Sequence, residues 1–187
     1  MRLFIAVTLP EEIKQKIGIL LDDLPAALRR EADIRWVRPD HFHLTLKFLG
    51  ECPEEKLSEI IETMDQAVEG VAPFSLTIGG LGYFPERGPL RIIWLGLLEG
   101  RDPLAGLAAR MDAALEPLGF SKETRPFSAH LTLGRVKAAK HPDKIRSLVE
   151  MSKSGSIGSQ TVNSAALYRS TLSPSGPTYT VLQPASF

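Results

Sequence analysis

The stretch HFHLTLKF (residues 41–48) alternates polar and apolar side chains, and its central HLTL returns at residues 130–133 inside SAHLTLGRV. Strict alternation is typical of a strand with one buried face. On the first strand His43 and Thr45 point to one face, and the leucines between and after them point to the core. The second copy places His130 and Thr132 in the same way. The sequence therefore predicts two strands that each present one histidine and one threonine together.

The elements around the two copies follow one order. The first half predicts strands and helices at 3–9 (strand), 13–24 (helix), 43–46 (strand), from 53 (helix) and 74–78 (strand). The second half predicts them at 90–97 (strand), 102–115 (helix), 130–133 (strand), from 142 (helix) and 161–170 (strand). His43 and His130 are 87 residues apart, and this offset relates the other elements as well. We expect an internal duplication, with pseudo-repeats of about 1–86 and 87–187, in a single two-lobed domain over 1–187.

Two polar or glycine-rich stretches predict loops between these elements. MSKSGSIGSQ (151–160) separates the last helix of the second half from its strand, and GGLGYFPERG (79–88) follows the last strand of the first half. Tyr83 and Phe84 in the second of these loops are expected at the rim of a cleft between the lobes.

Composition restricts the classes of function. Twenty-two basic residues balance 22 acidic residues, which argues against a protein that wraps long nucleic acid through many phosphate contacts. Cys52 is the one cysteine, so no intrachain disulfide can form and a reducing compartment is favoured. No run approaches the roughly 18 apolar residues of a membrane span. We expect a soluble, cytoplasmic protein without a membrane partner, and the lack of a heptad pattern favours a monomer.

The paired His and Thr residues suit chemistry at phosphorus. If the two lobes face each other, the imidazoles of His43 and His130 flank one small cavity. An imidazole gives or takes a proton near neutral pH, so one ring can act as base while the other acts as acid. Thr45 and Thr132 can donate hydrogen bonds to phosphate oxygens. Such a displacement needs no metal, and the usual HExxH and CxxC spacings are missing, so no cofactor is expected.

These motifs resemble the two-histidine phosphoesterases, which are defined by two His-x-Thr-x motifs. The runs RLFIAVTLP (2–10), WVRPDHFHLTLKFLGE (36–51) and HLTLGRV (130–136) are similar to those of bacterial and archaeal RNA 2',3'-cyclic phosphodiesterases, historically called 2'-5' RNA ligases. The resemblance implies a bilobal α+β fold with two antiparallel sheets forming a central cleft. It also implies metal-independent hydrolysis of a terminal 2',3'-cyclic phosphate to a 2'-phosphate, on an RNA 3' end or a small cyclic nucleotide.

The resemblance also implies roles for individual residues. His43 is the proton donor to the leaving oxygen, His130 is the proton acceptor that activates water, and Thr45 and Thr132 bind the phosphate. Arg135 matches a basic position of the family. By strict alternation Arg135 lies on the face opposite His130, so it reaches the phosphate only if the strand bulges or ends at Gly134.

Parity makes predictions for the neighbours of the first motif. Lys47 shares parity with His43 and is a candidate for the site, whereas Phe42 and Phe48 share the parity of the leucines and are expected in the core. Other candidates to guide an RNA end are basic residues near the strand ends, namely Arg35, Arg38, Arg87 and Arg125.

Three other functions remain open at this point. The same acid and base can run the reaction backwards and join a cyclic phosphate to a 5'-hydroxyl through a 2'-5' link. A nucleotide-binding module without chemistry is a second alternative, although a binder does not need a matched acid and base. A zinc hydrolase with His41, His43 and His130 as ligands is the third, because histidines at i and i+2 on a strand can converge on one ion.

Overall fold

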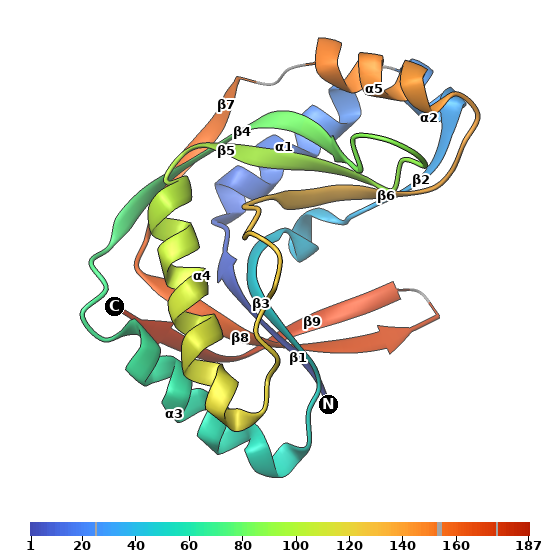
Figure 1. Cartoon of the computed structure of the whole chain (residues 1–187). Coiled ribbons are helices and arrows are strands. Elements are labelled where there is room, and N and C mark those ends of the chain that lie inside the picture. Colours follow the sequence, from blue (N-terminus) through green and yellow to red (C-terminus); the bar gives the residue numbers. More distant parts are fainter. Residues whose placement is uncertain (25, 153–154, 175) are drawn as a thin grey trace.

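The computed structural model describes residues 1–24, 26–152, 155–174 and 176–187. It is an α+β structure with two antiparallel sheets and helices packed on their outer faces (Figure 1). The strands are β1 (Arg2–Thr8), β2 (Ala32–Trp36), β3 (His43–Glu51), β4 (Phe74–Phe84), β5 (Ile92–Glu99), β6 (Leu131–Ala139), β7 (Ser156–Val162), β8 (Ser164–Ser173) and β9 (Gly176–Ser186). The α-helices are α1 (Glu11–Asp23), α2 (Ala26–Glu31), α3 (Leu57–Val68), α4 (Arg101–Leu115) and α5 (Pro142–Met151).

The two sheets have matching strand orders. One sheet runs β3-β1-β8-β9, and the other runs β6-β5-β4-β7 with β2 added outside β6. Each sheet takes its first two strands from one half of the chain and its third strand from the other half. The two HLTL strands, β3 and β6, hold equivalent places in this arrangement. The predicted fold class is confirmed, and β2 is the one strand in the described residues that breaks the matched order.

The two halves exchange their third strands, and this exchange makes one predicted strand wrong. The sequence predicted a single strand over 161–170, but β7 ends at Val162 and β8 begins at Ser164. The chain changes sheets between them, because β7 pairs with β4 whereas β8 pairs with β1. Periodicity does not mark this break, because the residues on both sides of Asn163 suit a strand.

Both predicted loops contain strand residues. In the loop predicted at 151–160, residues from Ser156 onward form the edge strand β7, and residues 153–154 lie outside the described chain. The glycine-rich stretch that starts at Gly79 continues β4 as far as Phe84. Its pairing with β5 shifts by one residue at Gly80, whose φ of 77° only glycine adopts readily. A bulge at this glycine therefore keeps in the sheet a stretch that its composition assigned to a loop.

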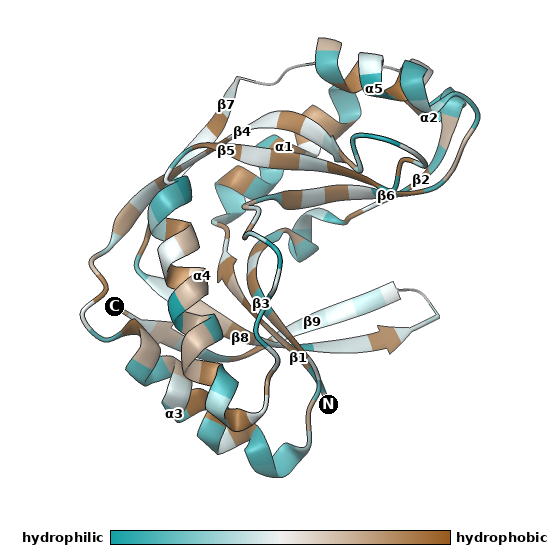
Figure 2. Cartoon of the chain, viewed as in Figure 1, coloured by the Kyte–Doolittle hydropathy of each residue, from teal (hydrophilic) through white to brown (hydrophobic). Residues whose placement is uncertain are grey.

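Leucines of the two HLTL copies lie in the core, as alternation predicted. Leu44 is 1% exposed, and Leu131 and Leu133 are fully buried. On the outer side of the β3 sheet, α3 packs against α4, and α4 packs against β3. Figure 2 shows hydrophobic residues along β1 and β3 and at intervals on these two helices. The packing thus buries the leucine face of β3 under the helices and leaves the opposite face for the polar residues of the motif.

Two elements between α1 and β3 were not predicted. Residues 26–36 form the short helix α2 and the strand β2, which pairs with β6. Five residues of strand are too few for a clear periodic signal, so the pairing with β6 decides their structure. Among the described residues, no helix is long and apolar enough to cross a membrane.

Candidate active site

His43 is the first residue of β3, and aromatic rings surround it. Its Nδ1 lies 2.7 Å from the carbonyl oxygen of His41. The Phe4 ring lies 4.8 Å from the imidazole between centroids, and the Tyr179 ring meets it edge-on at 5.2 Å. Tyr168 stacks on Phe4 at 5.0 Å and joins its hydroxyl to that of Thr8 at 2.6 Å. The imidazole is therefore held by one backbone contact and by ring packing.

His130 stands directly before β6 and makes the same backbone contact. Its Nδ1 lies 2.7 Å from the carbonyl oxygen of Ser128. Phe84 meets the imidazole edge-on at 5.2 Å, which supports the prediction that this aromatic residue lies at the cleft. Trp94 lies 6.5 Å away and extends over Gly82 of β4, where a β-carbon would overlap its ring. A glycine at position 82 thus leaves room for the indole, whose plane is inclined by 61° to the ring of the second histidine.

Both motif strands contain a bulge at the last leucine of HLTL. In β3, Thr45 pairs with Ala6 but Lys47 pairs with Ile5, so Leu46 is the extra residue. In β6, Thr132 pairs with Trp94 but Gly134 pairs with Ile93, so Leu133 is the extra residue. Each bulge reverses the parity of the residues that follow it.

The second bulge resolves the conflict over Arg135. Arg135 pairs with Ile92, two residues from Trp94 on β5, and Trp94 pairs with Thr132. Residues two apart on a strand share a face, and directly opposed residues do so as well. Arg135 therefore lies on the face of Thr132, and its side chain is exposed. The sequence required a bulge before Arg135 for this arginine to reach the face of the motif, and the structure has one at Leu133, directly before Gly134.

The first bulge makes two predictions wrong. Lys47 was a candidate for the histidine face, but it is only 7% exposed and is buried on the helix side. There its ammonium binds the carboxylate of Asp112 on α4 and donates to the carbonyl oxygen of Ser121 at 3.0 Å. Phe48 was expected in the core but is 70% exposed, with its ring 6.1 Å from Phe4 on the histidine face.

Phe48 is a candidate site residue that the sequence reasoning missed, although a signal for it exists. Phe48 and Arg135 are 87 residues apart and so occupy equivalent positions in the two halves. A bulge that brings Arg135 to the histidine face predicts the same change for Phe48 at the matching place. The two sides of the site therefore differ, with an aromatic ring on β3 where β6 carries a guanidinium.

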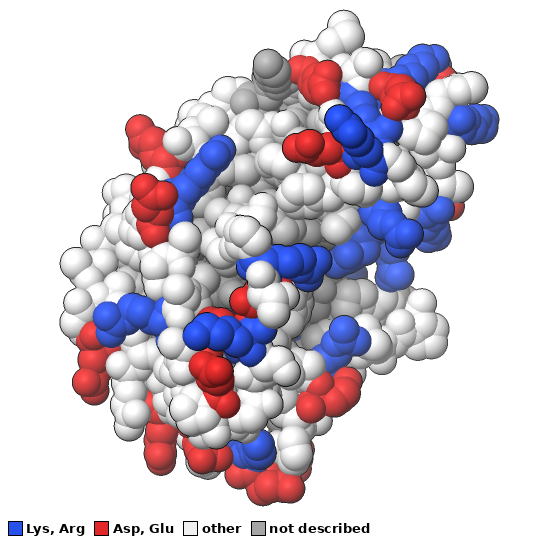
Figure 3. Space-filling model, viewed as in Figure 1, with Lys and Arg blue, Asp and Glu red and all other residues white. Residues whose placement is uncertain are grey.

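The two motif strands lie close together although they belong to different sheets. Cα atoms of β3 and β6 approach within 8 Å of each other. Figure 3 shows a hollow on this side of the molecule, with Lys and Arg side chains gathered around its rim. The sheets thus bring the two HLTL stretches to a shared cleft.

Burial controls the protonation of the first histidine. Loss of solvent lowers the pKa of His43 to about 4, although the contact with the carbonyl of His41 acts in the opposite direction. The positive charges of His41, Arg135 and Lys14 lower this pKa further. In the free protein the ring is therefore neutral at pH 7.

The described residues contain no group of three or more His, Cys, Asp or Glu side chains arranged to hold a metal ion. His41, a ligand in the zinc alternative, places its Nε2 3.7 Å from a carboxylate oxygen of Asp40 and its ring 4.8 Å from that of Tyr179.

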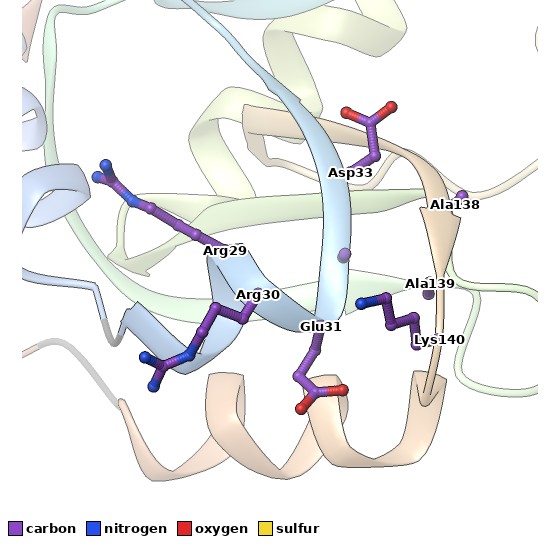
Figure 4. A pocket seen from close by; sticks show the side chains of 8 residues that line it. Arg29, Arg30, Glu31, Asp33, Ala138, Ala139 and Lys140 are labelled. Atoms are coloured by element: carbon purple, nitrogen blue, oxygen red, sulfur yellow. The ribbon is translucent and has the colours of Figure 1, made fainter.

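A shallow, open surface pocket lies elsewhere (Figure 4). Its lining comes from the end of α2, the start of β2 and the end of β6, and consists of Arg29, Arg30, Glu31, Ala32, Asp33, Ala138, Ala139 and Lys140. His130 precedes the start of β6, so the length of that strand, at about 3.3 Å per residue, separates the pocket from the histidine. The pocket is therefore distinct from the cleft.

The HLTL pair and the matched sheets agree with comparisons to known proteins. Residues 7–94 and 96–179 match the family of LigT-like phosphoesterases. This chain belongs to that family. A curated RNA 2',3'-cyclic phosphodiesterase of Methanothermobacter thermautotrophicus is 35% identical to this LigT-like chain over 182 residues, covering 97% of this chain and 96% of the relative.

Two further relatives extend the comparison to sequence and structure. The RNA 2',3'-cyclic phosphodiesterase of Thermotoga maritima is 39% identical over 187 residues, covering 100% of the LigT-like chain and 96% of the relative. The crystal structure of E. coli LigT with 3'-AMP has a TM-score of 0.78 at 29% identity, covering 99% of this chain and 97% of LigT. The family predicted from the motifs is therefore confirmed over nearly the whole chain.

Proposed function

We propose that this LigT-like phosphoesterase hydrolyses a terminal 2',3'-cyclic phosphate of RNA to a 2'-phosphate. The observation that carries the proposal is the equivalence of the two motif strands. In each copy, the histidine Nδ1 contacts the carbonyl oxygen of the residue two positions earlier, and a threonine follows on the same face of the strand. Relatives named RNA 2',3'-cyclic phosphodiesterase support this choice of substrate.

In this proposal the two histidines act from the two lobes. His130 accepts a proton from water, which attacks phosphorus, while His43 gives a proton to the leaving 3'-oxygen. Thr45, Thr132 and the exposed Arg135 hold the non-bridging oxygens and stabilise the charge that develops on them. The acid, the base and the donors to the phosphate oxygens all come from the chain, so we expect metal-independent turnover.

The low pKa of His43 places a condition on its role as donor. Burial keeps the ring neutral in the free protein at pH 7, whereas a donor has to be protonated when the substrate is bound. A cyclic phosphate in the cleft brings a negative charge beside the ring, and an opposite charge at about 4–6 Å raises the pKa of a histidine. Protonation of His43 is therefore coupled to substrate binding in this mechanism.

The aromatic side of the cleft supports a nucleotide as substrate. Phe48 exposes its ring on the histidine face, next to Phe4 and on the opposite side of the site from Arg135. A base can stack on such a ring without sequence preference. E. coli LigT, a family member, has been crystallised with ATP and with NADP+ as well as with 3'-AMP.

The reverse reaction and a pure binding function remain the alternatives. Joining a cyclic phosphate to a 5'-hydroxyl requires the same acid and base, so the site serves both directions. A binding module has no use for two histidines in matched tautomers. The single domain over 1–187, the monomeric state and the cytoplasmic location stay predictions from the sequence.

One experiment separates these functions. The protein is incubated with an oligonucleotide ending in a 2',3'-cyclic phosphate, with and without EDTA, beside His43→Ala and His130→Ala. We expect a 2'-phosphate product that EDTA does not affect, and a loss of about 10²- to 10⁴-fold in each variant. Loss of activity with EDTA favours the zinc hydrolase, and tight binding without turnover favours the module. Close to full activity in either variant contradicts the acid-base pair.

A further inference from the structure

The cleft carries two arginines that face each other across neighbouring strands. Arg35 on β2 and Arg135 on β6 are directly opposed residues of the antiparallel pair. Directly opposed side chains share a face of the sheet, so Arg35 lies on the face of Arg135 and Thr132. The neighbouring residues Ile34 and Trp36 have the opposite orientation, because their side chains fill the space on the core side where a β-carbon on Gly134 would lie.

This arrangement is unfavourable unless an anion lies near it. Like charges that are directly opposed across strands destabilise a sheet. In the described part of the chain, no carboxylate oxygen lies within 4.0 Å of either guanidinium. The neighbouring cations differ in this respect, because Arg38 is 3.0 Å from a carboxylate oxygen of Asp40 and Lys137 is 3.9 Å from one of Asp33.

Arg35 also extends across to the other sheet. A β-carbon on Gly176, the first residue of β9, would overlap the Arg35 guanidinium. Gly176 has a φ of 124°, so both its backbone conformation and this close approach favour glycine. The guanidinium thus lies between the two sheets, at the side of the cleft where β2 is added to the matched strand order.

The spacing of these groups fits a chain of phosphates. Because of the bulge, Arg135 lies two strand positions beyond Thr132, about 7 Å away. Arg35 is displaced by one more strand, about 5 Å. Arg35 therefore stands about one nucleotide away from the phosphate that the threonines are proposed to bind, on the basic side of the cleft.

We propose that Arg35 binds the phosphodiester on the 5' side of the terminal nucleotide, and so makes the enzyme favour a strand end over a cyclic mononucleotide. This inference rests on the proposed function, because it takes the terminal phosphate to lie between His43 and His130. Arg135 lies between the two phosphates. The strand β2, which has no counterpart in the other sheet, supplies the second phosphate site.

Three substrates with the same terminal nucleotide test the inference. They are the 2',3'-cyclic mononucleotide, a dinucleotide with a natural internal phosphodiester, and the same dinucleotide with a neutral methylphosphonate in that position. We expect Arg35→Gln to lower kcat/KM about tenfold for the natural dinucleotide alone, the effect of one lost hydrogen bond between charged groups. It should leave the mononucleotide and the methylphosphonate unchanged. For Arg35→Gln with the natural dinucleotide, the plot of log affinity against log salt concentration should have a slope that is less steep by about 0.7 than for the unmodified protein.

Arg30→Gln is the matched control, because it removes one exposed positive charge from α2 at the far end of β2. We expect this variant to treat the three substrates as the unmodified protein does. Arg35→Lys keeps the charge without the planar pair of donors and should recover part of the preference.

Two results overturn the inference. One is an equal effect of Arg35→Gln on all three substrates, and the other is no effect of the methylphosphonate on the unmodified protein. If the protein turns over none of the substrates, the proposed hydrolysis fails while the phosphate site is still tested. In that event the affinities of the two dinucleotides bearing a 2'-phosphate decide it, and equal affinities for unmodified protein and Arg35→Gln contradict it.

Discussion

His43 and His130 make the same backbone contact, each with Nδ1 2.7 Å from the carbonyl oxygen of the residue two positions earlier. A carbonyl oxygen only accepts, so Nδ1 carries a proton in both rings. In the neutral ring Nε2 is then an unprotonated acceptor, and in the charged ring it is a donor. Each histidine can therefore act as either base or acid through Nε2 alone, and the surroundings of each ring decide which role it takes.

The proposed roles predict that the two histidines respond differently to the leaving group. A nucleoside p-nitrophenyl phosphodiester releases p-nitrophenolate, a much weaker base than a ribose oxygen, so its departure needs little help from an acid. We expect His43→Ala to lose less than about tenfold in kcat with this substrate, against about 10²- to 10⁴-fold with the cyclic phosphate. His130→Ala should lose about the same factor with both.

Release of p-nitrophenolate is followed by absorbance, and hydrolysis of the cyclic phosphate is followed by separation of the products. Thr45→Ser serves as a control, because it keeps the hydroxyl and should lower both rates by one common factor. The roles are reversed if His130→Ala, rather than His43→Ala, is rescued by the better leaving group.

A second prediction concerns stability against pH. Burial lowers the pKa of His43 from 6.5 to about 4, so between these two values the unfolded chain binds a proton that the folded protein does not. Stability therefore falls as pH decreases from 6.5 to about 4, and this effect is absent above 6.5. The full loss is about 3 kcal/mol for a shift of this size.

Replacement of His43 should remove this dependence. Urea unfolding of His43→Gln and of the unmodified protein, at pH 7 and at pH 4, gives the four free energies of unfolding that are needed. We expect the protein to lose about 3 kcal/mol more than the variant between the two pH values. His141→Gln replaces an exposed histidine and should behave as the unmodified protein does. Equal losses in all three proteins would show that the His43 ring is not desolvated.

The residues around the bulges show how far the sequence predicts this site. Alternation places His43, Thr45, His130 and Thr132 correctly, because all four precede the bulged leucine. It fails for Lys47 and Phe48, which follow it. A bulge depends on how two strands pair, and this pairing is a tertiary property that the sequence of one strand does not contain. For Arg135 the failure could be foreseen, because Gly134 suggested a bulge and a role for the arginine required one.

The duplication explains which parts of the fold were predicted. Apart from the strand predicted over 161–170, the elements that recur at the offset of 87 residues were assigned correctly, because each copy supports the other. β2 and α2 have no counterpart, and they were missed. The place where β7 ends and β8 begins was missed as well, because it reflects the exchange of third strands between the sheets. The sequence thus predicted what the halves share, whereas the differences between them required the structure.

The exposed ring of Phe48 leads to a third prediction. Stacking of a base on an aromatic side chain contributes about 1–3 kcal/mol per base. We expect Phe48→Ala to raise KM for a cyclic nucleotide by about tenfold or more, with a smaller effect on kcat, because in the proposed binding mode the ring stacks on the base and does not contact the reacting phosphate. Phe48→Tyr keeps the ring and should keep KM. Thermal unfolding checks that the variant still folds. The Phe48 side chain is 70% exposed, so its loss should cost little stability. An unchanged KM in Phe48→Ala would exclude stacking at this position.

The buried ion pair of Lys47 and Asp112 joins the two halves of the site. Lys47 on β3 binds Asp112 on α4, and both Asp112 oxygens accept from the backbone N–H of Glu123, at 3.2 and 3.3 Å. Burial alone would raise the pKa of Asp112, but the hydrogen bonds from Lys47 and Glu123 outweigh it and lower the pKa. The pair thus fixes the start of the segment that leads to His130.

Removal of one partner should therefore affect stability and activity together. Asp112→Asn leaves the Lys47 ammonium buried without its counter-charge, and we expect a loss of about 3 kcal/mol in the free energy of unfolding. The double variant Lys47→Met with Asp112→Leu removes both charges and should recover most of this stability. It also lacks the contacts to Ser121 and Glu123, so kcat should stay low although the fold is restored. Recovery of stability and full kcat together in the double variant would show that the ion pair does not position His130.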